Sequence, residues 1–197
     1  MKRTIGTSAG LLLIAGLLLQ GCAAPLLVAG TAAGVAGTAV VAERRPPAVV
    51  LEDQGAEMRV MNAINGDRAL ATDVNVSATS YNRVLLLTGQ VPDEAAHARV
   101  LAHVRANAKA ASVHDHLKVG APSLLAQRTR DTRTTARVKS ALLGEDGIPG
   151  VHVKVVTERD IVYLMGRVSR EEGQRAAAIA QRVDGVRMIV LVFEYLS

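Results

Sequence analysis

The chain of 197 residues carries 23 basic and 18 acidic side chains, and its formal charge of +5 is too mild an excess to indicate a nucleic-acid-binding protein. Aromatic residues make up only 2% of the chain, which disfavours a surface that stacks bases or sugars. A single cysteine excludes an internal disulfide.

The N-terminus has the parts of a secretion signal. The basic pair Lys2 and Arg3 precedes an apolar run at 11–19. Leu19-Gln20-Gly21-Cys22 ends the run, with small residues just before and after the cysteine. Leu-x-Gly-Cys matches the lipobox of bacterial lipoproteins. We therefore predict a signal peptide over 1–21 and a covalent lipid on Cys22, with no other cofactor. A transmembrane anchor is the alternative, but it needs about 20 apolar residues and this run is shorter.

Residues 22–47 are predicted to form a tether that is rich in alanine and glycine and is closed by Pro46-Pro47. Gly30-x-x-x-Gly34 could instead mark a helix-packing face, but the glycines, threonines and proline of this segment favour the tether. In Gram-negative bacteria, an aspartate after the lipidated cysteine retains a lipoprotein at the inner membrane. Ala23 stands there, so we predict a lipid anchor in the periplasmic face of the outer membrane.

An internal repeat organises the remaining sequence. The runs 84–91 and 161–168 both read [Val/Ile]-x-x-Leu-x-Gly-x-Val, and neighbouring residues match at nearly the same offset. The repeat predicts two small domains, over 48–120 and 121–197.

The first copy reads as helix, strand, strand, helix, strand. Asp53 is predicted to N-cap the first helix, whose apolar stripe is Val60, Ala63 and Ile64. Next come an alternating strand, a turn, a more fully buried strand, an alanine-rich helix opened by Asp93 and a last alternating strand. The strands are expected at 74–78, 84–91 and 113–119, the turn at 80–83 and the second helix at 93–108.

The second copy repeats this order, and Ser169-x-x-Glu172 is a capping box at the start of its second helix. Its elements are expected at 132–143, 151–157, 160–168, 170–183 and 186–196. The fold class is therefore α+β, with two tandem αββαβ domains, each of two helices packed on a three-stranded mixed sheet. Gly89 and Gly166 lie inside strands, where we expect the following helix to approach the backbone closely.

The order αββαβ, the glycine inside the second strand and the tandem arrangement resemble the BON domain. With its lipobox and Ala/Gly-rich tether, the whole chain is similar to outer-membrane lipoproteins that carry two BON domains. The resemblance implies a non-catalytic envelope protein that binds anionic phospholipid and supports outer-membrane integrity. It also implies that the phospholipid contact lies on the first helix of the second domain.

The sequence offers little for catalysis or metal binding. It contains no Gly-x-Ser-x-Gly elbow, His-Glu-x-x-His helix or Walker loop, so no enzyme is predicted. His114 and His116 would share one face of a strand, but a zinc site needs at least three protein ligands. We therefore read them as solvent-facing histidines and predict no metal. An exported lipoprotein also meets no nucleic acid.

The best candidate site is basic. On a helix, Arg130, Arg133 and Arg137 fall within about 60° of one another and to the side of the apolar face. Together with Lys139 they form the predicted binding site for an anionic phospholipid membrane. The alternative interpretation of these basic residues is a helix face that is only solvated and binds no ligand. The alternative for the protein is an adaptor for other envelope proteins, accessory to outer-membrane protein assembly.

Overall fold

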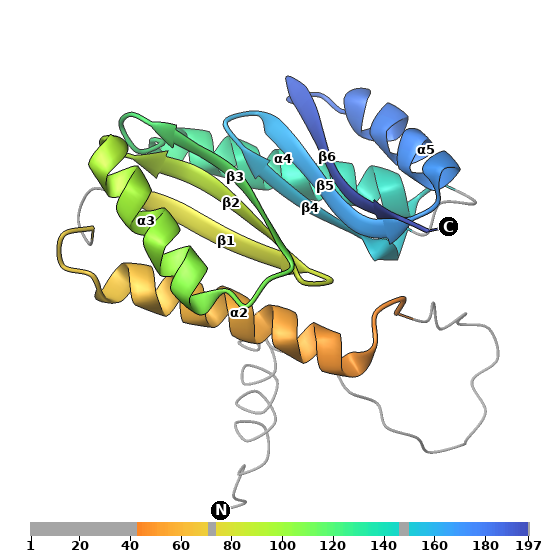
Figure 1. Ribbon diagram of the computed structural model, residues 1–197. Coiled ribbons are helices and arrows are strands. Elements are labelled where there is room, and N and C mark those ends of the chain that lie inside the picture. The colour runs from red at the N-terminus through yellow and green to blue at the C-terminus, as the bar shows by residue number, and fades with distance from the viewer. Residues whose placement is uncertain (1–42, 71–73, 146–149, 197) are drawn as a thin grey trace, which may run out of the picture. The chain divides into compact units, whose positions relative to one another are not determined.

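The computed structural model describes residues 43–70, 74–145 and 150–196. These residues all belong to a single unit, Val40–Ser197. They form the predicted α+β fold, in which the order αββαβ occurs twice (Figure 1).

Each repeat begins with a long helix. The first repeat consists of α2 (Pro47–Gly66), β1 (Asn75–Tyr81), β2 (Val84–Val91), α3 (Glu94–Asn107) and β3 (Ser112–Val119). The second consists of α4 (Leu125–Leu143), β4 (Val153–Glu158), β5 (Ile161–Val168), α5 (Arg170–Gln181) and β6 (Met188–Tyr195), with a short 3-10 turn at Gly150–His152 before β4. Ser169 and Glu172 form the predicted capping box at the start of α5.

Both sheets are mixed, as predicted. The strand orders are β1-β2-β3 and β4-β5-β6. In each sheet the central strand pairs antiparallel with the strand before it and parallel with the strand after it. The parallel connection runs through α3 or α5, because parallel strands cannot be joined by a tight turn.

Two apolar clusters hold the helices on their sheets. In the first repeat, Val60 and Ile64 of α2 and Val100 of α3 are buried with Leu85 and Leu87 of β2. The second repeat has an equivalent cluster, made by Val138, Leu142, Val162, Leu164, Ala176 and Ala180. Each repeat therefore has a core of its own.

A third apolar cluster joins the two repeats. Tyr81 and Leu86 of the first sheet are buried together with Tyr163, Met165 and Val192 of the second. Because side chains alternate along a strand, β2 and β5 turn one set toward their helices and the other set toward the opposite sheet. These central strands are consequently buried on both faces.

The first helix does not begin at Asp53, as the sequence predicts. It begins two turns earlier, at Pro47, and Asp53 is a buried residue of its interior. The Asp53 carboxylate accepts hydrogen bonds from the backbone N–H groups of Asn82 (2.7 Å) and Arg83 (2.8 Å). Both turn residues have positive φ, the signature of a tight hairpin turn whose twist matches its strands. Asp53 thus anchors the β1–β2 turn.

Asp131 has the same role in the second repeat. The second long helix starts at Leu125 and not near 132, so Asp131 is also an interior helix residue and is buried. Its carboxylate accepts from the backbone N–H groups of Arg159 and Asp160, each at 3.0 Å, and these two turn residues also have positive φ. The repeat therefore includes a buried helix aspartate that anchors each hairpin.

We expect Asp131→Asn to lower the free energy of unfolding of fragment 43–197 by roughly 1.5–3 kcal/mol, as for the loss of hydrogen bonds to a charged group. The amide can accept from one turn N–H group, but its NH₂ group faces the other. Urea unfolding measures the effect. The control is Asp184→Asn, at an exposed aspartate, which should stay within about 0.5 kcal/mol of wild type. Equal stability of the two variants would contradict an anchoring role.

Gly89 and Gly166 do face a close backbone approach, but not from the following helix: Gly89 is approached by β1, and Gly166 by the 3-10 turn that precedes β4. A Cβ at Gly89 would lie 1.8 Å from the carbonyl oxygen of Asn75, and one at Gly166 would lie 2.6 Å from that of His152. Gly89 also has φ +121, which side chains rarely allow. Both glycines are therefore structural residues.

Candidate functional site

The predicted lipidation site, Cys22, lies outside the described residues, as do the signal peptide and most of the tether. Of the two predicted sites, the structure therefore describes only the basic helix α4. Among the helices that the structure describes, none is long and apolar enough to cross a membrane.

The helix α4 presents its basic residues to solvent. Asp131, Thr134, Val138 and Leu142 form its buried face. Arg130, Arg133, Arg137 and Lys139 are all exposed. These side chains thus point away from the core, as helical periodicity predicts.

The exposed charges of α4 are all positive. Its one acidic residue, Asp131, is buried and is used by the hairpin turn. Arg130 donates a hydrogen bond to the side-chain oxygen of Gln127. Within residues 43–70, 74–145 and 150–196, no hydrogen bond or ion pair involves the side chains of Arg133, Arg137 or Lys139. These cations remain available to an external anion.

The four predicted residues do not form one row. Lys139 follows Arg137 by two positions, which turns its side chain about 200° around the helix. It lines a cavity of about 410 Å³ together with Arg45 and Lys154. The three arginines occupy one flank of the solvent-facing side of α4, and Lys139 occupies the other.

Arg128 shares the flank of Lys139, and the sequence interpretation missed it. Eleven residues separate the two, close to three full turns of helix, and that spacing is the signal that could have identified it. The Arg128 Nε group donates to the carbonyl oxygen of Ser123 at 3.0 Å, which fixes the side chain at the start of the helix. Two basic rows therefore border the solvent-facing side of α4.

Leucines mark both ends of this helix. Leu124 and Leu125 are 77% and 79% exposed, and Leu143 is 60% exposed. The basic helix contains no aromatic residue that could enter the acyl region of a bilayer. Exposed leucines offer apolar surface at the same place, so α4 combines cations with apolar ends.

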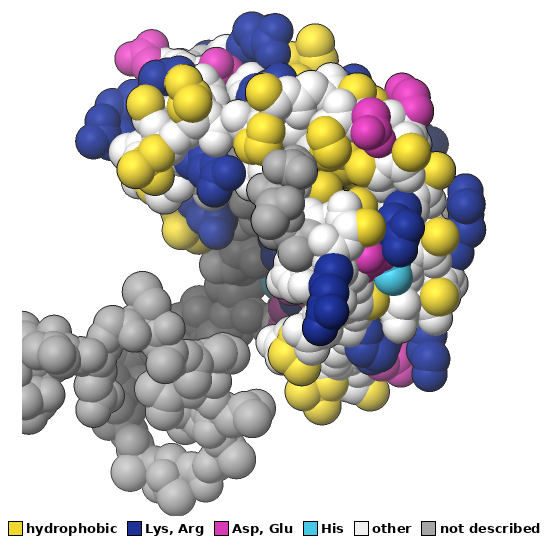
Figure 2. Space-filling model, turned by 90° about the vertical axis from the view of Figure 1, so that its left-hand side faces the viewer, with side chains coloured by type: hydrophobic (Ala, Val, Ile, Leu, Met, Phe, Trp, Pro, Cys, Tyr) yellow, Lys and Arg dark blue, Asp and Glu magenta, His cyan; other side chains and the backbone are white. Residues whose placement is uncertain are grey.

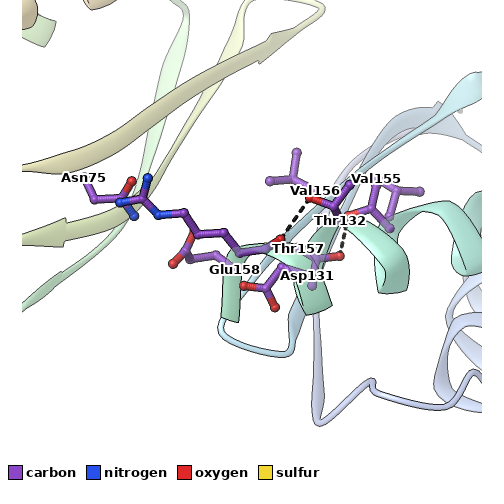
Figure 3. A pocket seen from close by; sticks show the side chains of 9 residues that line it. Asn75, Asp131, Thr132, Val155, Val156, Thr157 and Glu158 are labelled. Carbon is purple, nitrogen blue, oxygen red and sulfur yellow. Dashed lines mark hydrogen bonds between the residues drawn. The ribbon is translucent and has the colours of Figure 1, made fainter. Parts of the chain in front are cut away.

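A shallow polar cavity of about 300 Å³ lies beside α4 (Figure 3). Arg128, Thr132 and Thr135 line it from the helix, and Thr157 and Glu158 line it from β4. Thr135 donates to the hydroxyl of Thr157 at 2.8 Å. The lining has one arginine, Arg128, and two carboxylates, Asp131 and Glu158, so the cavity has no excess of positive charge, in contrast to the solvent-facing side of α4.

Figure 2 shows one face of the molecule, with its side chains coloured by type. On it, Lys and Arg side chains are interspersed with hydrophobic and acidic ones and do not gather into one patch.

The two strand histidines differ in environment. His114 is exposed, whereas His116 is half-buried and packs edge-to-face on Tyr163, with ring centroids 5.0 Å apart. The expectation that both face solvent is therefore wrong for His116. Burial lowers the pKa of His116 and favours its neutral form. No group of three or more metal-ligating side chains occurs among the described residues.

Comparison with known proteins places this fold in a family. Residues 52–121 and 130–195 each match the BON domain. The outer membrane lipoprotein DolP of Haemophilus influenzae is 31% identical over 187 residues, which cover 95% of both chains. The 21 kDa hemolysin of Actinobacillus pleuropneumoniae is 28% identical over 75% of this chain and 76% of its own.

A third relative is the osmotically-inducible protein Y of Escherichia coli, which is 30% identical over 71% of this chain and 70% of its own. The family match covers both repeats, and the match to DolP extends over nearly the whole chain. The chain therefore belongs to the BON domain family, as a lipid-anchored lipoprotein of the outer membrane that carries two BON domains.

Proposed function

We propose that this lipoprotein binds anionic phospholipid through the solvent-facing side of α4, and that it supports envelope integrity without catalysing a reaction. One observation carries the proposal: every exposed charge on α4 is positive, and Arg133, Arg137 and Lys139 have no partner among the described residues. Cations that are not already neutralised by the protein are free to pair with phosphate groups.

The magnitudes are adequate for a membrane site. Each Lys or Arg near an anionic surface contributes about 1 kcal/mol, so the three arginines together change affinity by a factor of order 100. A hundredfold gain in affinity is modest for a protein that must find the membrane from solution. A lipid anchor raises the effective concentration of α4 at the bilayer, and such linkage makes weak contacts effective.

The leucines at the ends of α4 supply a second contribution. Leu124 and Leu125 stand one turn before the first arginines and lie on the surface at the start of the helix. Apolar surface that enters the headgroup boundary gains roughly 25 cal/mol per Å². Binding through α4 therefore combines electrostatic attraction with shallow insertion, as in amphipathic helices that lie in the membrane interface.

A protein–protein adaptor is the second candidate function, and a different surface favours it. The edge strand β6 exposes Met188 (52%) and Leu191 (44%). The same residues line a cavity of about 380 Å³ with Ala177 of α5 and Ile189. An apolar groove beside an unpaired strand edge can accept an extended segment of another protein.

Sedimentation with vesicles tests the lipid proposal. Fragment 43–197, which contains all three apolar clusters, should sediment with phosphatidylglycerol vesicles and not with phosphatidylcholine vesicles. Binding should fade toward 1 M salt, where the Debye length falls to about 3 Å. If the fragment binds neither vesicle at low salt, the phospholipid proposal is wrong and the adaptor function takes its place.

A further inference from the structure

The last residues of the tether region are held against the body of the protein. Residues 43–45 immediately precede α2, and we refer to them as the clasp. The Arg44 guanidinium forms a bidentate pair with Glu172 of the second domain, with both N–O distances at 2.8 Å. Arg44 also donates to the carbonyl oxygen of Arg167 at 2.9 Å, and Arg167 donates back to the carbonyl oxygen of Arg44 at 3.0 Å.

The next residue is held by the first domain. Arg45 donates to Asp53 at 2.9 Å, and its guanidinium lies 3.9 Å from the centre of the Tyr81 ring. The Arg45 side chain is only 12% exposed, so this contact is largely shielded from solvent. Two consecutive arginines thus bind different domains. Lysine could not replace either of them, because a lysine side chain cannot make a bidentate contact with a carboxylate or stack on a ring as arginine does.

The clasp lies close to the proposed membrane site. Arg45 lines the same cavity as Lys139 and Leu143, which belong to the C-terminal end of α4. The chain between Cys22 and the clasp can span at most about 75 Å when fully extended. The point at which this chain meets the body therefore decides which surface can reach a membrane in which Cys22 is anchored.

We propose that the clasp fixes the outlet of the lipid tether beside α4, so that the anchor and α4 engage the same bilayer surface. Arg44 is then a positioning residue for membrane binding. This inference rests on the proposed function of α4. Its physical basis is effective concentration: linkage strengthens a second contact only when geometry allows both contacts at once.

Glu172 reports directly on the clasp. Its carboxylate is shared between Arg44 and the capping box, because Oε2 also accepts from the backbone N–H of Ser169 at 2.8 Å. The hydrogen bond from Arg44 is the main cause that lowers the pKa of Glu172 to about 2. The stabilisation is complete above the ordinary pKa of the carboxyl group, and it is lost as the pH falls through the lowered pKa.

The first experiment needs no lipid. The pKa of the Glu172 carboxyl is measured by NMR titration of fragment 43–197. We expect Arg44→Ala to raise this pKa toward its ordinary value, while Arg83→Ala, which removes a surface pair with Glu52, leaves it unchanged. An equal Glu172 pKa in wild type and Arg44→Ala would show that the clasp does not form and would overturn the inference.

The second experiment uses the full lipidated chain in phosphatidylglycerol proteoliposomes and measures hydrogen exchange of α4. Arg44→Glu should reduce protection of α4 by at least about tenfold, since well-placed linkage is worth roughly 10²–10⁴-fold in binding. The double variant Arg44→Glu, Glu172→Arg should recover it. The matched control is Arg99→Glu, which makes the same charge change at a pair with Asp67 that no clasp residue contacts.

The outcomes separate the two proposals. If α4 is protected equally in wild type and Arg44→Glu, the clasp does not position the helix and the inference is wrong, while the lipid proposal stands on the vesicle result. If fragment 43–197 binds no anionic vesicles, the lipid proposal fails and the inference fails with it. The Glu172 titration would then still show whether the contact itself exists.

Discussion

Replacing Arg130, Arg133 and Arg137 by glutamate is expected to weaken binding of fragment 43–197 to anionic vesicles by a factor of about 100 or more, with the fold intact. Each lost cation removes about 1 kcal/mol of attraction to the surface, and reversal of the charge adds repulsion. All three side chains are exposed, so stability should change by less than about 0.5 kcal/mol per residue. Vesicle sedimentation measures the affinity, and circular dichroism checks the fold.

The control reverses the charge of three other cations, all in the first domain. Arg68, Arg105 and Lys118 are exposed, and no ion pair or hydrogen bond of their side chains occurs in the described part of the chain. Arg83 and Arg99 would be poor controls, because they pair with Glu52 and Asp67. If the control weakens binding as much as the α4 variant does, net charge explains the effect and α4 is not a specific site.

Lys139 gives a further discrimination, because it lies on the other flank of α4. When the solvent-facing side of the helix meets the bilayer, both flanks contribute, and Lys139→Glu should weaken binding about fivefold or more. An unchanged affinity in Lys139→Glu, together with a large loss in the arginine variant, would mean that only the arginine flank touches lipid.

Substituting alanine for Gly89 is expected to destabilise fragment 43–197 by about 3 kcal/mol or more. A Cβ at this position would lie 1.8 Å from the carbonyl oxygen of Asn75, and both groups belong to paired strands that cannot separate without breaking the sheet. The backbone φ of +121 adds strain of its own. The melting temperature should fall by about 6 °C or more.

Gly166→Ala should have a smaller effect, of about 1–3 kcal/mol. Its Cβ would meet the carbonyl oxygen of His152 at 2.6 Å, without the strain of a positive φ. Gly66→Ala is the control, since a Cβ there has no neighbour within 4 Å. If Gly89→Ala melted at the temperature of Gly66→Ala, the close approach of β1 to β2 would not constrain this glycine.

Local sequence patterns were sufficient for the element order. The matched runs at 84–91 and 161–168 became β2 and β5, and Ser169 with Glu172 formed the predicted cap. Helix starts were less predictable. Asp53 has the chemistry of an N-cap, but a buried aspartate can also accept from a turn that is distant in the sequence, and the hairpin at Asn82 and Arg83 takes that role.

The sequence by itself determined the repeat, the mixed αββαβ architecture and the outward direction of the arginines on α4. Each of these follows from spacing along a single element, because side chains repeat every 3.6 residues in a helix and every two in a strand. Spacing reports which side of an element is buried. It carries no information about the element that buries it.

Only the tertiary structure decided how the faces are paired. Gln90 is completely buried because its amide oxygen accepts from Asn75 and Ser123 and its NH₂ group donates to Glu158 of the second domain. The same holds for Arg44, whose partner Glu172 is distant in the sequence. Such contacts depend on where two folded surfaces bring donors and acceptors within about 3 Å, a condition that no local periodicity encodes.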